Sequence, residues 1–113
     1  MFGIFKAKKQ KLADAAVALR HYEISKESIE LLRKTVNPRT FFGRCNDVAI
    51  SEERVTGKPS KFKRNTQLQT KLQIEFLDRA IAAGKRELLI ESMPSYEDQL
   101  TPEAFLYYKD LGL

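Results

Sequence analysis

The 113-residue sequence predicts an all-α protein, a small bundle of four to five helices closed by a short C-terminal helix. Apolar residues recur at spacings of three and four along most of the chain, which indicates helices with one apolar face. Asn37-Pro38 and Thr101-Pro102 each have the pattern of a helix start, a capping side chain followed by proline at the first helical position. No stretch of useful length alternates with the period of two that is typical of a strand.

The first helix is expected to begin at Lys9, after an N-terminal arm at residues 1–8, with residues 9–113 forming one helical domain. The run is rich in alanine and free of glycine, which favours helix. One face of this helix carries Leu12, Ala15, Ala16, Leu19 and Tyr22. Because Ser25 can cap a new start, the helix either breaks there or continues to about Val36.

The second helix is expected to run from Pro38 to about Thr56, because Gly57 can adopt the left-handed conformation that ends many helices. Glu52 is the one polar residue on its apolar face, and the adjacent pair Glu52 and Glu53 is expected to be solvated charge. The residues expected in the structural core are Phe41, Phe42, Cys45, Leu72 and Phe76.

A loop is expected after Gly57, and the next helix should begin between Ser60 and Thr66. A long apolar stripe follows, interrupted only at Gly84, so one helix to Ser92 is favoured over two. Thr101 and the proline after it begin the short final helix.

The net charge of +5 is unevenly distributed. Residues 1–13 contain four lysines and no acid, residues 54–74 contain six cations and no acid, and the rest of the chain is acidic on balance. Such segregation can indicate nucleic acid, anionic lipid or self-association of opposite patches as the partner.

The basic segment at 58–64 is the one candidate for nucleic-acid or anion contact, because its cations surround Phe62. Asn65, Gln67 and Gln69 follow it and could bond to phosphate or bases. The cations are Lys58, Lys61, Lys63 and Arg64.

No catalytic, metal or cofactor site is expected within one chain. His21 is the only histidine and is expected at the surface or an edge, and Cys45 is the only cysteine, which excludes a catalytic His set, a disulfide and a zinc site. The glycines are scattered, so no phosphate-binding loop is present. No apolar run approaches the length of a transmembrane helix, and no signal peptide is evident, so a cytoplasmic location is expected.

Two segments of the chain resemble a recurring helical module of Gram-positive bacterial and phage or mobile-element proteins. They are residues 24–32 and residues 37–44, the second with the sequence Asn37-Pro38-Arg39-Thr40-Phe41-Phe42-Gly43-Arg44. Its signature is E-S-x-x-L/I followed by N-P-x-x-F-F-x-R, and residues 94–103 resemble its acidic, proline-containing end. The resemblance covers roughly residues 24–50 and 90–111. It implies a helical fold and a bacterial or mobile-element setting, and it implies no catalytic residue because the module is uncharacterised.

The function expected from the sequence is protein–protein contact by a non-enzymatic helical module, with a homo-oligomer as one form of that contact. The alternative is a nucleic-acid-binding accessory protein that uses residues 58–64. The arm at residues 1–8, with Phe2, Ile4 and Phe5, either folds onto its own domain or a neighbour or rests on an anionic bilayer.

Overall fold

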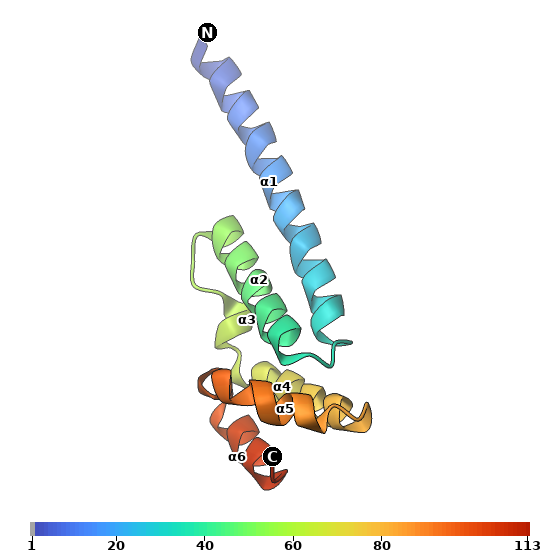
Figure 1. The fold of residues 1–113 in the computed structure, drawn as a ribbon. Coiled ribbons are helices and arrows are strands. Elements are labelled where there is room, and N and C mark those ends of the chain that lie inside the picture. The colour runs from blue at the N-terminus through green and yellow to red at the C-terminus, as the bar shows by residue number, and fades with distance from the viewer. Residues whose placement is uncertain (1) are drawn as a thin grey trace.

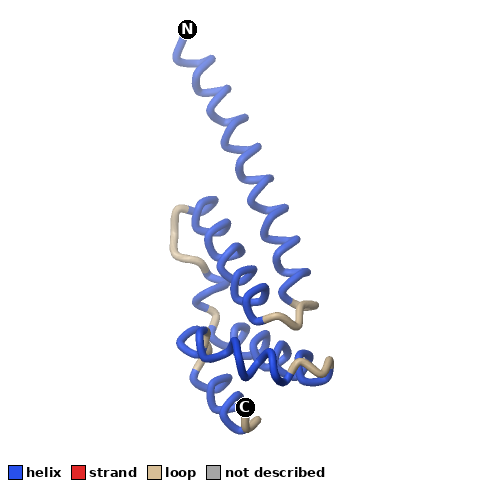
Figure 2. The backbone as a smooth tube through the Cα atoms, in the orientation of Figure 1, coloured by secondary structure: helices blue, strands red, loops and turns tan. Residues whose placement is uncertain are grey.

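The computed structural model describes the backbone of residues 2–113 and the side chains of residues 14–113. Over the described backbone the protein is all-α, as the sequence predicts, with helices and loops and no strand (Figure 2). The elements are α1 (Phe2–Leu32), α2 (Pro38–Thr56), α3 (Lys61–Arg64), α4 (Thr66–Ala82), α5 (Arg86–Ser92), the 3₁₀ turns η1 (Met93–Ser95) and η2 (Glu97–Gln99), and α6 (Pro102–Asp110).

The helices form an elongated molecule of 68 × 23 × 19 Å (Figure 1). The first two helices, α1 and α2, make an antiparallel hairpin, and α4 and α5 lie across its closed end, with α6 beyond them. At a rise of about 1.5 Å per residue, α1 is about 46 Å long and α2 about 28 Å. The N-terminal part of α1 therefore runs past the end of α2 (Figure 1).

Both ends of α2 confirm the sequence prediction. The Asn37 side chain accepts hydrogen bonds from the backbone N–H groups of Arg39 at 2.9 Å and Thr40 at 3.4 Å. At the other end Gly57 has φ +68°, and its N–H donates to the carbonyl of Glu53 at 2.8 Å. Local residues therefore determine where this helix starts and stops.

The helix α1 differs from the sequence expectation at both ends. It is continuous through Ser25 and already helical at Phe2, whereas a start at Lys9 was expected. The proposed contacts of the arm at residues 1–8 lie outside the described side chains.

The C-terminal end of α1 falls at Leu32, short of the expected Val36, because α4 caps it. The Arg79 guanidinium donates to the carbonyl of Leu32 and to that of Thr35, each at 2.9 Å. The Leu32 carbonyl is among those that a helix end leaves without intrahelical partners, and Thr35 lies in the connection that follows the helix. One side chain of α4 thus fixes the corner between α1 and α2.

The prediction of a single helix to Ser92 is wrong, because the helix ends after Ala82. Gly84 has φ +74°, a left-handed conformation that interrupts the helix. Its N–H donates to the carbonyl of Ile81 at 2.9 Å, which satisfies an otherwise free helix-end acceptor. The start of the last helix at Pro102 is as predicted, with the Thr101 hydroxyl accepting from the N–H of Ala104 at 3.3 Å.

The main core lies between α2, α4 and the segment after α5, and it is built on aromatic rings. Phe41 and Phe76 are 0% and 1% exposed and stack with their centroids 4.6 Å apart. Phe42 meets Phe41 edge-on at 5.0 Å and stacks on Tyr96 at the same distance. Leu72 is also buried, whereas Cys45, which was expected in the core, is only half-buried at its rim.

Candidate functional site

The surface of α1 that packs along α2 combines small and polar residues with Leu32. The buried or half-buried positions at helical spacing are Ala18, His21, Ser25, Ser28 and Leu32, here called the α1 seam. The Ser28 hydroxyl is buried, with that residue 1% exposed, and has no hydrogen-bond partner among the described residues. His21, expected at the surface or an edge, is half-buried and its Nδ1 also lacks a partner among the described residues. Within the seam, the large buried apolar side chain is Leu32, which is 0% exposed and belongs to the core.

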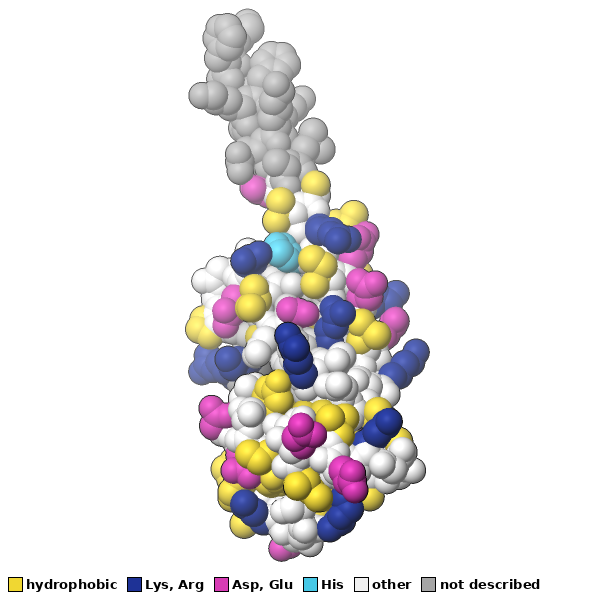
Figure 3. All heavy atoms as spheres, in the orientation of Figure 1, with side chains coloured by type: hydrophobic (Ala, Val, Ile, Leu, Met, Phe, Trp, Pro, Cys, Tyr) yellow, Lys and Arg dark blue, Asp and Glu magenta, His cyan; other side chains and the backbone are white. Residues whose placement is uncertain are grey.

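Two other large apolar side chains of α1 point into solvent, whereas Leu32 is buried and Ile29 packs against the core. Leu19 is 58% exposed and Tyr22 65% exposed, and Ala15 on the same side of the helix is exposed as well. These three residues, at spacings of four and three, are here called the α1 face. Figure 3 shows hydrophobic side chains at the surface of this part of the molecule, among charged ones.

The sequence analysis placed these residues on one face of the first helix, and the structure shows where that face lies. The described members of that predicted stripe, including Ala16, are exposed; Leu12 lies outside the described side chains. The reason is that α2 covers the α1 seam, and the rest of the described protein leaves the α1 face open. An apolar stripe at helical spacing is typical of a packed face, and no described residue of this chain covers it.

The predicted cations all lie on the surface, next to or within α3. Lys58, Lys61, Lys63 and Arg64 are each exposed, and none belongs to an ion pair within 4.0 Å among the described residues. The structure thus groups them on one short helix and the loop that leads into it.

Glu52 of α2 holds α3 in place, a role that the sequence analysis missed when it assigned the residue to solvated charge. Its carboxylate accepts from the Ser60 hydroxyl at 2.7 Å, from the N–H of Lys61 at 2.8 Å and from the N–H of Phe62 at 3.1 Å. The hydrogen bond from Ser60 is the main cause that holds the pKa of Glu52 below its ordinary value, and the hydrogen bonds from the two backbone N–H groups lower it as well. Glu53 also accepts from the N–H of Ser60, at 3.3 Å.

Two of the three amides proposed for contacts with bases are instead used inside the protein. The Asn65 side chain caps α4 by accepting from the N–H of Leu68 at 3.1 Å. Gln69 is buried and donates to the carbonyl of Phe62 at 2.9 Å. Gln67 is exposed and keeps its side chain toward solvent.

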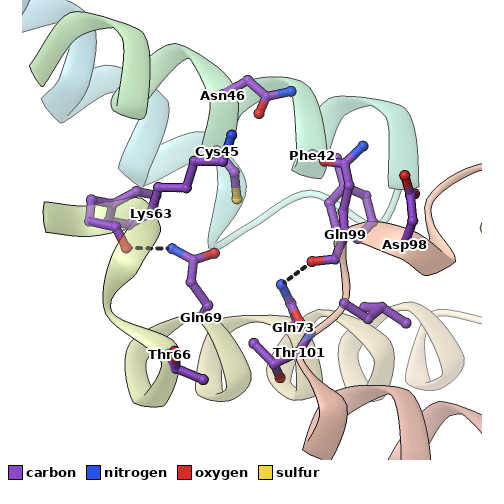
Figure 4. Close-up of a pocket in the computed structure, with 12 residues that line it drawn as sticks. Phe42, Cys45, Asn46, Lys63, Thr66, Gln69, Gln73, Asp98, Gln99 and Thr101 are labelled. Atoms are coloured by element: carbon purple, nitrogen blue, oxygen red, sulfur yellow. Dashed lines mark hydrogen bonds between the residues drawn. The ribbon is translucent and has the colours of Figure 1, made fainter. Parts of the chain in front are cut away.

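A groove of about 530 Å³ lies beside α3, between α2, α4 and residues 98–101 (Figure 4). Gln73 crosses its floor, donating to the carbonyl of Gln99 at 3.1 Å and accepting from the N–H of Thr101 at 2.9 Å. The Cys45 thiol lines the groove, and burial raises its pKa to about 12. The thiol is therefore protonated at neutral pH, which makes it a poor nucleophile.

The described residues include no cluster of three or more His, Cys, Asp or Glu side chains placed to hold a metal ion. Nor does any helix of the described part combine the length and apolar character needed to cross a bilayer. Two surfaces of the described protein are candidates for a binding site: the exposed apolar residues of the α1 face and the cations of α3. No protein-family model, no curated protein and no solved structure matches the chain.

Proposed function

We propose that this protein is a non-enzymatic helical module that works by protein–protein contact, and that the contact surface is the α1 face. The observation that carries the proposal is the exposure of Leu19 and Tyr22, 58% and 65%, on a helix that projects past its neighbour α2. Grouped apolar side chains of this size on a surface mark interaction sites more often than scattered single ones do.

The arrangement of α1 supports the proposal in a second way. An amphipathic helix binds a protein partner through apolar residues spaced by three and four, which is the spacing of Ala15, Leu19 and Tyr22. The α1 seam already supplies the contact with α2, so the α1 face is available without unfolding the hairpin. The resemblance to a helical module of Gram-positive bacteria and mobile elements supports a cytoplasmic bacterial or phage setting for this contact.

Site-specific photo-cross-linking in cells tests the proposal. A photoreactive phenylalanine analogue replaces Tyr22, and in a matched control it replaces Leu106 of α6, which is equally exposed at 65%. We expect irradiation to give a discrete protein adduct from position 22 and none of comparable yield from position 106. Equal yields at the two positions, or no protein adduct at position 22, would overturn the proposal.

A second candidate function, nucleic-acid binding, is favoured by the α3 cations. Four exposed cations lie on a segment that Glu52 holds in place, and among the described residues none of the four is neutralised by an ion pair. Positive charge on one face is the electrostatic footprint of a phosphate-binding surface.

The test of this candidate is a salt titration of binding to single- and double-stranded DNA and to RNA. The variant changes Lys58, Lys61, Lys63 and Arg64 to Ala, and the control changes four exposed cations elsewhere, Arg33, Lys34, Arg39 and Lys85, to Ala. Both variants lose the same charge. We expect the four-residue variant at 58–64 to reduce the magnitude of the slope of log K against log salt concentration by up to about 3, and the control to reduce it by less. Each phosphate contact that is lost removes about 0.7 to 0.9 from that magnitude. Equal effects of the two variants, or no salt-dependent binding, would exclude this function.

A further inference from the structure

We infer that the partner of the α1 face is a second copy of this chain, and that the two α1 helices pack antiparallel. The inference rests on the proposed function, because it names the protein that the α1 face binds. It draws on three observations: the exposure of the face, its repeat, and the distribution of charge along α1.

The repeat of α1 is that of a helix that packs on a like helix. Apolar residues alternate at spacings of three and four through Leu12, Ala15, Leu19 and Tyr22, and the same register reaches Ile29, which is half-buried against the chain's own core. This is the a/d pattern of a coiled coil, in which each apolar side chain fits between residues of the facing helix. Lys26 is the one interruption, and its long apolar stem can lie along the contact while the ammonium reaches water.

The charge along α1 favours self-pairing in one direction. Residues 1–13 contain four lysines and no acid, whereas residues 14–32 contain four acids, among them Glu23, Glu27 and Glu30, and only two basic residues, Arg20 and Lys26. Parallel pairing of two copies would set lysines beside lysines. Antiparallel pairing sets the basic segment of each copy beside the acidic segment of the other, which is the favourable arrangement.

The shape of the hairpin is compatible with this pairing. The α1 seam contacts α2, and the α1 face lies on another side of the same helix, so one α1 can contact both its own α2 and a second α1. Two hairpins related by a two-fold axis would then form a four-helix arrangement in which the same face of each copy is covered. A self-complementary surface of this kind is what an isologous dimer requires.

Pulsed electron paramagnetic resonance on the purified protein tests both the partner and the direction. The label is placed by Arg33→Cys, at the exposed end of α1, in a Cys45→Ala background whose fold is checked by circular dichroism. Antiparallel pairing of two helices about 46 Å long separates the two labels by more than roughly 35 Å, and parallel pairing brings them within roughly 20 Å. We expect the long distance, and we expect the dipolar signal to disappear when Leu19→Lys is added.

Two outcomes would overturn the inference: the short distance, or no dipolar signal at any concentration. The photo-cross-link at Tyr22 separates this failure from failure of the proposed function. An adduct with the mass of two chains supports the inference. An adduct with a different protein overturns the inference and leaves the proposed function standing, whereas no adduct removes both.

Discussion

Two contacts of α2 differ in what they bury. Against α4, α2 places Phe41 at 0% exposure in a stack with Phe76. Against α1, it meets a seam in which the buried Ser28 hydroxyl has no partner among the described residues, while Leu19 on the same helix is 58% exposed. One contact is built on stacked aromatic rings, whereas the other buries a hydroxyl beside small and polar residues and Leu32.

The difference indicates which contact stabilises the domain and which surface of α1 is left uncovered. Apolar burial of about 25 cal/mol per Å² is the main source of stability, so the aromatic contact between α2 and α4 holds the domain together. The α1 helix contributes Leu32 to the core, whereas Leu19 and Tyr22 lie outside it. The free energy of burying the α1 face becomes available only when a partner covers it.

The largest expected effect is on the aromatic core. Phe76→Ala should lower the free energy of unfolding by about 4 kcal/mol, because a ring that is 1% exposed leaves a cavity behind. Tyr22→Ala, studied at low protein concentration, should change it by less than about 0.5 kcal/mol, because that side chain is exposed. Urea unfolding followed by circular dichroism measures both, and equal losses would show that α1 packs as tightly as the core.

A smaller effect is expected where α2 holds α3. Glu52→Gln should cost about 2 kcal/mol, since it weakens three hydrogen bonds to a charged acceptor. Glu91→Gln, at an exposed carboxylate, is the control and should be near neutral.

The pH dependence of the same site follows from the lowered pKa of Glu52. A carboxylate with a folded-state pKa below its ordinary value stabilises the protein fully above that ordinary value, 4.5, and loses this contribution as the pH falls through the lower folded-state pKa. Wild type should therefore lose more stability than Glu52→Gln between neutral and acidic pH. Parallel pH profiles for the two proteins would contradict the role given to Glu52.

The smallest effects should have opposite signs at two buried serines, each 1% exposed. Ser28→Ala should stabilise the protein by about 1 kcal/mol, because it removes a buried hydroxyl that has no partner among the described residues. Ser60→Ala should destabilise it by about 1 kcal/mol, because the Ser60 hydroxyl donates to Glu52 and accepts from the N–H of Lys63. Thermal unfolding of both variants measures the difference, and a loss of stability in Ser28→Ala would contradict the description of the seam.

Features determined by neighbouring residues could be predicted from the sequence. The start of α2 at Pro38 and its end before Gly57 follow from residues within a few positions of each boundary. The break at Gly84 was missed because the apolar stripe continues through it, and the sequence alone does not show whether a glycine takes a positive φ.

Features that depend on distant parts of the chain could not be predicted. The apolar spacing of Leu19 and Tyr22 was visible, but the side of α1 that α2 covers is marked mostly by small and polar residues, which give a weaker apolar signal. The role of Glu52 depends on a loop eight residues or more away in the sequence. The exposed cations of α3 were found from charge alone, whereas the internal use of Gln69 was not.

Sedimentation equilibrium of the purified protein tests the central claim, that the α1 face is covered by another copy, most directly. We predict that the mass of wild type rises with concentration from 13.0 kDa toward twice that value. The double variant Leu19→Lys with Tyr22→Lys should remain at 13.0 kDa, while the equally exposed Leu106→Lys on α6 should behave as wild type. A wild-type mass of 13.0 kDa at every concentration would contradict the account.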